Sequence, residues 1–273
     1  MPEGERIRAN EAGFPADEGA VIWDLERVAA GHWRAAEEER LGDWLLRAAR
    51  GFTGRANSAL ATGDCGLPLD DALAAVCDWY RARGLRPMIA VPMPLPAEDA
   101  PPHPLDAHLA ERSWPPRSGP AFVMTCRTDA ATGPLELPPG LELRTTPEPD
   151  EAWLAMYHYR GQDLPPIARD LLLSALWQSF VAIHDAGGAP AAIARVSVSG
   201  GWAGITAVEV AQSRRRQGLG TAITRAACAE AAGLGADRVF LQVEVGNTAA
   251  LSLYERCGFR YSHWYQYRVG PAR

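Results

Sequence analysis

One segment of the chain has residue types and spacing that could hold a phosphate group. VEVAQSRRRQGLGTAITRA, from Val208 to Ala226, places a strand signal that ends at Val210 before a turn with Gly218 and Gly220 and a helical run from Leu219. The first N–H groups of a helix lack an intrahelical acceptor and carry partial positive charge, and glycine keeps side chains away from them. Each hydrogen bond to a charged group contributes about 1.5–3 kcal/mol. The segment therefore predicts a diphosphate site.

Three adjacent arginines precede these glycines. Arg215 and Arg216 could add positive charge at the rim of the site, and the alternative is a solvated surface patch. The spacing is not that of a Walker loop, which needs a lysine, or of the GxGxxG loop of a dinucleotide fold. Nucleic-acid binding through the arginines fits poorly, because the cluster is short and the formal net charge of the chain is −6.

A second segment, NTAALSLYERCGF, follows a further strand signal, LQVEV. The two segments together resemble the signatures of the GNAT acetyltransferase superfamily, whose acetyl-CoA motif reads Arg or Gln, two residues, Gly, one residue, and Gly or Ala. Arg215, Gly218 and Gly220 fit that motif. The positions in register with the second signature are Asn247, Ala250, Leu253, Tyr254, Gly258 and Phe259. The resemblance covers Leu141 to Arg268.

The resemblance implies transfer of an acetyl or other acyl group from acetyl-CoA to a primary amine, by direct attack in a ternary complex. The strand that ends at Val210 would splay from the one containing LQVEV, with the pantetheine in the gap and one backbone N–H polarising the thioester carbonyl. The implied cofactor contacts are Val208, Val210, Arg215, Arg216, Gln217, Gly218, Leu219, Gly220, Thr221, Asn247, Ala250 and Tyr254. The alternative function is a non-catalytic module that binds acetyl-CoA as a sensor or interaction scaffold.

Two proton transfers would accompany this reaction. A lysine-type amine has a pKa of about 10.4 and must lose a proton, for which Glu209, Glu244 or a water relay are the candidates. Strand alternation puts Glu209 on the face opposite Val208 and Val210, and a merely solvated or salt-bridged carboxylate is an equal alternative for each glutamate. Tyr254 occupies the general-acid position of the resembled family. A proton transfer from tyrosine to a thiolate is uphill by roughly 2 kcal/mol, and the alternative is a tyrosine that only packs against the cofactor groove.

Other conspicuous residues predict less. The six histidines lie in no HExxH pattern and beside no cysteine pair, so no metal site is expected. The aromatic residues Tyr261, Trp264, Tyr265 and Tyr267 could wall an acceptor pocket, but aromatic strands more often belong to a core. EEERLGDW, from Glu37 to Trp44, is interpreted as a solvated helix face.

The helices and strands of the second half are predicted from the periodicity of apolar residues and from the proline, glycine and capping residues that mark their ends. LELRTT reads as a strand, two short helices start with proline signals, and SFVAIHDAGGAPAAIARVSVSGGWAGITAVEV contains three strand signals separated by glycine pairs. A helix from Leu219 to Ala232, a strand, a helix capped by Asn247 and a last strand complete the order. This order predicts an α+β fold around one mixed sheet, the GNAT fold by resemblance.

The first half contains a weak echo of the second. Helix and strand signals in LPLDDALAAVCDWYRARGLRPMIAVPM and in PLDAHLAERSW followed by PAFVMTCRT match the order of the second half. In this echo ATGDCGLP replaces the arginine and double glycine, and Leu109 stands in place of the tyrosine. We therefore predict a degenerate GNAT-like domain over residues 1–130, which shapes the acceptor cleft or stabilises the fold, a Pro- and Gly-rich linker over 131–140, and a catalytic domain over 141–273.

Composition sets the remaining expectations. The chain has 273 residues, 27 arginines with no lysine, and five cysteines without a CxxC pair. Neither a signal peptide nor a membrane-length apolar run is evident, so we expect a cytoplasmic protein that binds neither membrane nor nucleic acid. The acceptor, a small molecule or a peptide amine, and the oligomeric state, a homodimer among the options, are left open.

Overall fold

A computed structural model describes residues 18–96, 102–131, 135, 137–158 and 163–272. Its eleven strands over these residues form one sheet, in the order β1-β2-β3-β4-β11-β5-β10-β9-β8-β7-β6. The strands are β1 Glu37–Leu41, β2 Trp44–Ala48, β3 Ala59–Leu60, β4 Met88–Met93, β5 Ala121–Arg127, β6 Glu142–Thr146, β7 Trp177–His184, β8 Pro190–Ser199, β9 Trp202–Val210, β10 Arg238–Glu244 and β11 Arg260–Val269. The helices are α1 Glu18–His32, α2 Leu69–Arg81, α3 Pro104–Glu111, α4 Thr128–Ala131, α5 Glu151–Met156, α6 Ile167–Leu172, α7 Leu219–Gly233 and α8 Thr248–Arg256, with a 3-10 turn at Gln212–Arg214.

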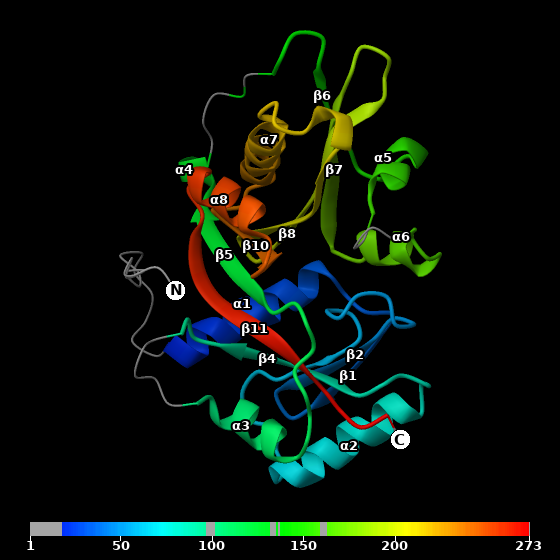
Figure 1. Ribbon diagram of the computed structural model, residues 1–273, viewed down its shortest axis with the longest axis vertical. Coiled ribbons are helices and arrows are strands. Elements are labelled where there is room, and N and C mark those ends of the chain that lie inside the picture. The colour runs from blue at the N-terminus through cyan, green and yellow to red at the C-terminus, as the bar shows by residue number, and fades with distance from the viewer. Residues whose placement is uncertain (1–17, 97–101, 132–134, 136, 159–162, 273) are drawn as a thin grey trace.

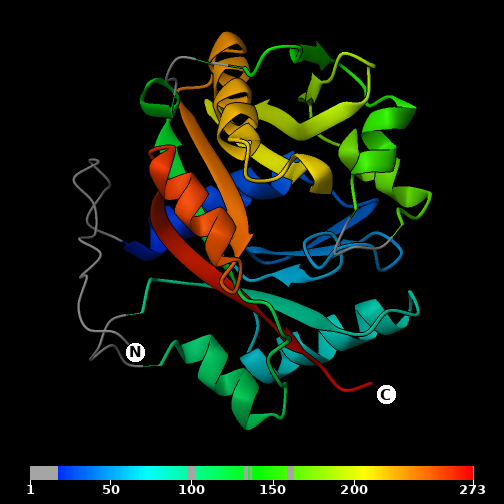
Figure 2. The same cartoon turned by 45° about the horizontal axis from the view of Figure 1, so that its top comes forward.

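The two halves of the chain exchange their last strands at the centre of the sheet. β3 runs parallel to β4, and β9 runs parallel to β10. β11, the last strand of the second half, pairs with β4 and β5, and β5 in turn pairs with β10. Figure 1 shows β11 and β5 lying side by side between the upper and lower parts of the molecule, and Figure 2 shows the same arrangement after rotation. The sheet therefore joins both halves through backbone hydrogen bonds.

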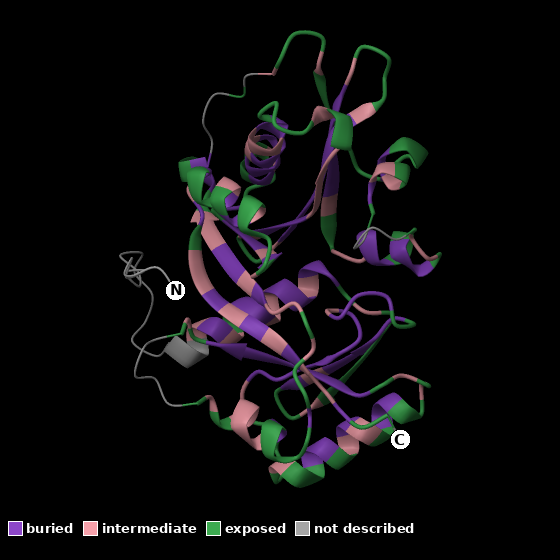
Figure 3. Cartoon of the chain, viewed as in Figure 1, coloured by how far each residue is buried: buried purple, intermediate pink, exposed green. Residues whose placement is uncertain are grey.

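Helices cover both faces of the second half of the sheet. α7 packs on β7, β8 and β9, and its buried residues share one core with α8 and the facing strands. On the opposite face lie α5 and α6, together with α1 from the first half of the chain. Figure 3 shows the buried residues concentrated in the central strands and on the inner sides of these helices. Helix α1 thus completes the core of the second half.

The second half follows the predicted order of elements, and the ends of its helices have the expected caps. The Asp150 side chain accepts a hydrogen bond from the backbone N–H of Trp153, and the Asn247 side chain accepts one from Ala250. β7, β8 and β9 form the predicted antiparallel meander. The prediction of an α+β fold around one mixed sheet is confirmed.

The interpretation of EEERLGDW as a helix face was wrong. These residues form β1, a turn at Gly42 and Asp43, and the first residue of β2, in an antiparallel hairpin at the edge of the sheet. Gly42 has a φ of +55°, and its backbone abuts that of Asp64 and Cys65 in the loop before α2. An exposed edge strand tolerates a run of charged residues as well as a solvated helix does, so the exposure was correct and the element was not.

The predicted linker coincides partly with ordered structure. Helix α4 reaches Ala131, the first residue of the expected 131–140 segment, and residues 132–134 and 136 lie outside the described residues. The domain boundaries remain a prediction, since β5 and β11 each pair with strands from the other half. Within the described ranges, none of the helices combines the length and the apolar character that crossing a membrane requires.

Candidate active site

The parallel strands β9 and β10 separate within the sheet. Their pairing begins at Trp202 with Arg238 and ends at Ile205 with Leu241, although β9 continues to Val210 and β10 to Glu244. A bulge in β9, where Ala207 has a φ of +53°, coincides with a register shift against β8. The predicted splay of these two strands is confirmed.

The two faces of the splayed strands differ in chemistry. Val208 and Val210 pack against the apolar core beneath α7. The carboxylate of Glu209 lies on the opposite face, where it accepts a hydrogen bond of 2.9 Å from the backbone N–H of His158. The predicted alternation is confirmed, and the carboxylate side of β9 is the side covered by α5 and α1.

Helix α7 begins directly after the splay. Gly218 is its N-cap with a φ of +80°, and the first N–H to bond back along the helix is that of Ala222, to the Gly218 carbonyl. The N–H groups of Leu219, Gly220 and Thr221 therefore have no intrahelical acceptor. A side chain at Gly218 would meet no atom within 4 Å. This open space in front of unpaired amides fits a diphosphate.

Gly220 has a different role from Gly218. A methyl group at Gly220 would overlap Cδ1 of Leu253 on α8. The glycine therefore allows the first turn of α7 to approach α8, and its missing side chain makes room for leucine and not for a ligand.

The three arginines before α7 have three environments. Arg214 forms an ion pair of 3.4 Å with Asp185, and Arg215 donates a hydrogen bond of 3.4 Å to the Val210 carbonyl at the end of β9. Arg216 is exposed with a φ of +64°. Exposed Gln217 is bonded to the Ser213 carbonyl at 3.5 Å. The two arginines nearest to the helix start are thus the ones available to an anion there.

Tyr254 lies in the core next to this region. Helix α8 presents it to the same apolar cluster that contains Val208 and Leu219, and its ring packs edge-on against Phe259 at 5.8 Å between centroids. Only 8% of the residue is exposed. Burial, and secondly the nearby Cys257, raise the pKa of the phenol above its ordinary value. The hydroxyl therefore carries its proton at neutral pH.

Glu209 and Glu244 end on the same side of the sheet. Glu244 lies two residues after Gln242 on β10, so the two side chains are on the same face of the sheet. Glu244 is exposed, whereas the Glu209 side chain is 25% exposed. Glu209 Oε1 also lies 3.5 Å from Nδ1 of His158. The carboxylate of Glu209 is held in position by this residue, and that of Glu244 faces solvent at the strand end.

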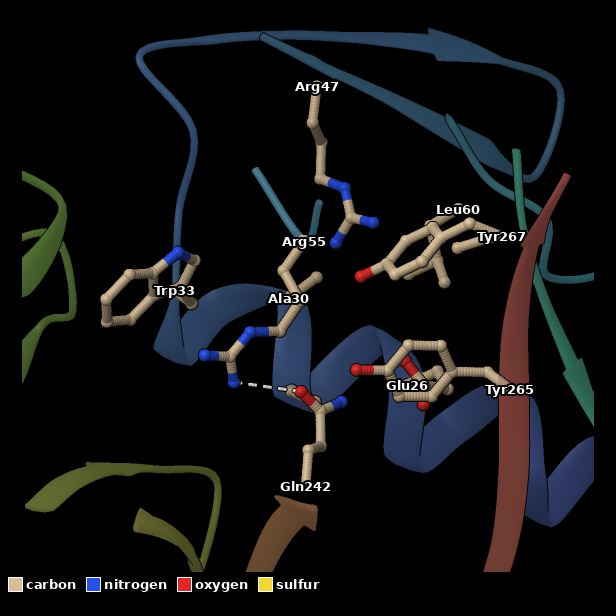
Figure 4. Close-up of a pocket in the computed structure, with 11 residues that line it drawn as sticks. Glu26, Ala30, Trp33, Arg47, Arg55, Leu60, Gln242, Tyr265 and Tyr267 are labelled. Atoms are coloured by element: carbon tan, nitrogen blue, oxygen red, sulfur yellow. Dashed lines mark hydrogen bonds between the residues drawn. The ribbon is translucent and has the colours of Figure 1, made fainter. Parts of the chain in front are cut away.

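A cavity lies on this side of the sheet, against the point where β9 and β10 separate. Figure 4 shows Arg47, Arg55, Tyr265 and Tyr267 pointing toward it, with Gln242 of β10 closing one end. Its lining residues are Glu26, Ala29, Ala30, Trp33, Arg47, Arg55, Leu60, Ala90, Gln242, Tyr265 and Tyr267. Most of these belong to the first half of the chain.

Sequence reasoning anticipated only part of this cavity. Tyr265 and Tyr267, considered for either a core or an acceptor pocket, are both buried and lining, whereas Tyr261 packs on Phe122 and Trp264 joins the core under α2. The other polar lining residues were missed. They lie in α1, β2, the loop after β2 and β10, and no local pattern in the sequence links them. Over the described part of the chain, no group of His, Cys, Asp and Glu is placed to hold a metal ion.

Splayed parallel strands, followed at once by a glycine-capped helix with unpaired amides, define an acetyltransferase of the GNAT class. The fold agrees: a GCN5-related N-acetyltransferase from Kribbella flavida superposes with a TM-score of 0.68 at 20% identity, covering 92% of this chain and 96% of that one. A tandem GNAT protein from the clavulanic acid biosynthesis pathway gives 0.66 at 15% identity, with coverage of 92% and 88%.

The chain belongs to the family described as "Probable histone acetyltransferase Rv0428c C-terminal", whose model matches residues 19–268. It is 30% identical over 265 residues to the probable histone acetyltransferase Rv0428c of Mycobacterium tuberculosis, covering 91% of this chain and 74% of that protein. It is 28% identical over 262 residues to the uncharacterized N-acetyltransferase YobR of Bacillus subtilis, covering 91% and 98%. The predicted resemblance and the prediction of an acetyltransferase are confirmed.

Proposed function

We propose that the protein transfers an acetyl group from acetyl-CoA to a primary amine by direct attack in a ternary complex. The observation that carries this proposal is the separation of β9 and β10 after Ile205 and Leu241, immediately before the glycine-capped start of α7. The diphosphate would lie on the first amides of α7, with open space at Gly218 and with Arg215 and Arg216 at the rim. The main chain near Val208 and Val210 would hold the pantetheine.

Several further residues would complete this binding surface. Gln217 and Thr221 flank the helix start, and Asn247 and Ala250 form the capped first turn of α8. When bound, acetyl-CoA supplies the activated acyl group. The chain supplies the binding surface and the proton transfers.

The acceptor nitrogen loses one proton and the sulfur of the leaving thiolate gains one. We assign the first transfer to the carboxylate of Glu209, because it faces the side of the sheet that carries the cavity and is held by His158. Glu244 is the alternative, and a water relay is the third. We assign the second transfer to the Tyr254 hydroxyl, which lies beside the splay and carries a proton at neutral pH, although burial makes it a weaker acid than an ordinary tyrosine.

The first half of the chain is proposed to be non-catalytic, because carboxylates of the chain itself already bind the backbone N–H groups in the loop that corresponds to the one before α7. In the loop between β3 and α2, the Asp64 N–H donates to the Asp43 carboxylate, and the Gly66 N–H donates to the Asp64 carboxylate. Two carboxylates of the chain therefore occupy the place of an anionic ligand and would repel a diphosphate. Leu109 of α3 is fully buried and offers no proton.

The five cysteines are all free thiols, and three of them are buried. Because free thiols persist in a reducing compartment, we propose a cytoplasmic location.

Calorimetry with CoA and a spectrophotometric assay of thiol release together test the proposed function. An enzyme binds CoA and releases thiol from acetyl-CoA in proportion to added amine. A sensor binds CoA without amine-dependent release. Absence of heat with CoA, or unchanged CoA affinity after Gly218→Trp, would contradict the proposed diphosphate site.

A further inference from the structure

An extra residue in β9 decides on which face of the sheet Glu209 lies. Thr206 pairs with Arg195 of β8. Glu209 follows three residues later but pairs with Ile193, which is only two residues from Arg195. Residues three apart in a regular strand point to opposite faces, and the bulge instead puts Thr206 and Glu209 on the same face. Without the bulge, the Glu209 carboxylate would face α7 and not the backbone N–H of His158.

The bulge contains a strained backbone conformation. Ala207 has a φ of +53°, in the left-handed region that residues other than glycine rarely adopt. Such a conformation persists only where the surrounding structure holds it. Ala207 packs against the apolar cluster that α5 and α6 form with residues of the first half, and Thr206 beside it is buried. The contacts that stabilise the bulge therefore come from the α6 side of the sheet.

The fully buried guanidinium of Arg195 lies on that side and joins Thr206 to the ends of two helices. Its Nε donates a hydrogen bond of 2.6 Å to the carbonyl of Leu172, the last residue of α6. Its Nη1 donates to the carbonyl of His32, the last residue of α1, at 3.1 Å and to Oγ1 of Thr206 at 3.4 Å. The last carbonyls of a helix have no intrahelical donor. Arg195 therefore satisfies two buried carbonyls and a hydroxyl of β9 with one side chain.

The end of α1 contacts β9 at a second point. The Ser197 hydroxyl lies 3.3 Å from Nη1 of Arg195 and 2.9 Å from Nδ1 of His32. The His32 ring lies against β9 at Gly204, where an added methyl group would come within 3.1 Å of Nδ1. Gly204 directly precedes Ile205, the last residue of β9 that pairs with β10. The hydrogen-bond network around Arg195 therefore contacts β9 on both sides of the residue at which the splay begins.

We propose that Arg195 is a positioning residue for the proposed base. Through Thr206 it holds the bulge in β9, and the bulge presents the Glu209 carboxylate on the α5 side of the sheet. The planar fork of guanidinium donors reaches two helix ends and a strand at once, which the compact ammonium group of a lysine does not. This inference rests on the proposed function, because it names the group that positions the base of that same site.

Two substitutions of Thr206 test this inference in the full chain. Valine keeps the shape of threonine and removes the hydroxyl, whereas serine keeps the hydroxyl. With acetyl-CoA and the best acceptor among spermidine, glycinamide and a lysine-containing peptide, we expect Thr206→Val to lower kcat at least about tenfold and Thr206→Ser to retain it. The Kd for CoA should stay unchanged in both. Thr62→Val changes a buried threonine of the first half and is the matched control, which should leave kcat unchanged.

A second background separates positioning from a loss of stability. In Glu209→Gln, Thr206→Val should cause no further loss of kcat, because no carboxylate remains to be placed. Amide hydrogen exchange at His158 gives a readout without turnover, since its N–H donates to Glu209 Oε2. We expect Thr206→Val to speed this exchange at least about threefold, toward the rate in Glu209→Ala. Arg195→Lys should act in the same direction, but it can unfold the chain, so the Thr206 variants decide.

Wild-type kcat and wild-type exchange at His158 in Thr206→Val would overturn the inference, and so would an equal fold loss of kcat in both backgrounds at position 209. If none of the three amines is turned over, the exchange at His158 decides. Failure of the proposed function is recognised separately, by calorimetry that shows no CoA binding or by a retained kcat in Glu209→Gln. The second of these results would also remove the base that Arg195 is proposed to position.

Discussion

Gly220 of α7 and Leu253 of α8 touch so closely that a methyl group on the glycine would overlap Cδ1 of the leucine. The first turn of α7 carries the amides proposed to bind the diphosphate, and α8 carries Tyr254. This contact therefore helps to set the distance between the proposed cofactor cradle and the proposed acid.

Gly220→Ala should destabilise the protein through this contact. We expect a loss of about 1–3 kcal/mol in the free energy of unfolding from overpacking, measured by urea denaturation. Leu253→Ala in the same chain should recover part of that loss, because it removes the overlapping atom. Gly218→Ala is the comparison. The added methyl group would lie in open space, but the backbone there has a φ of +80°, so the strain should lower the free energy of unfolding by roughly 1 kcal/mol. Absence of any coupling between positions 220 and 253 would refute the contact.

Tyr254→Phe should lower kcat by about 10²–10⁴-fold and leave the Kd for CoA unchanged, because only the acidic proton is lost. Burial raises the pKa of this phenol, so its ionisation should produce no fall in wild-type kcat below about pH 10. Tyr261→Phe is the matched control, since that ring packs on Phe122. Equal kcat in wild type and Tyr254→Phe would assign the proton to another donor.

Glu209→Gln should lower kcat by about 10²–10⁴-fold if this carboxylate is the base. The amide oxygen can still accept the hydrogen bond from the His158 N–H, so the loop after α5 should stay in place. Steady-state kinetics of Glu209→Gln and Glu244→Gln, measured side by side, identify the base. A larger loss at Glu244 would transfer the role to it, and small losses at both would indicate a water relay.

Arg215→Ala should weaken CoA binding by about tenfold, with a smaller dependence of affinity on salt, because a charged hydrogen bond to the diphosphate is lost. Arg214→Ala offers a control from the same arginine run. Its side chain is paired with Asp185, so CoA affinity should not change. Calorimetry at two salt concentrations measures both variants, and equal behaviour would argue against a specific role for Arg215.

His32 should make the stability of the protein depend on pH. Burial, and secondly Arg195, lower its pKa from 6.5 to about 4, so the unfolded chain binds a proton below pH 6.5 that the folded chain does not. The contribution of neutral His32 to the free energy of unfolding is fully present above pH 6.5. It declines as the pH falls toward 4, by about 3 kcal/mol in total. Urea denaturation across this range should show a flatter profile for His32→Asn than for wild type. Parallel profiles would contradict the assigned protonation.

The sequence alone determined the elements of the second half and the place of the glycine-capped helix start at which we propose the diphosphate site. Helix caps at Asp150 and Asn247, glycine pairs between strands and Gly218 before α7 act on their immediate neighbours, so their consequences can be read locally. The alternation that separates Glu209 from Val208 is equally local, because it follows from the period of a strand.

Only the tertiary structure decided how the acceptor side is built. Arg55 meets Gln242 across 187 positions of the chain, and Glu26 meets His263 across 237. These contacts exist because β5 and β11 are exchanged between the halves and α1 covers the sheet of the second half. The same cause explains the wrong interpretation of Glu37–Leu41: pairing with β2 made an edge strand of residues whose local propensities also suit a helix. Strand exchange and long-range burial depend on the whole fold, and no short segment encodes them.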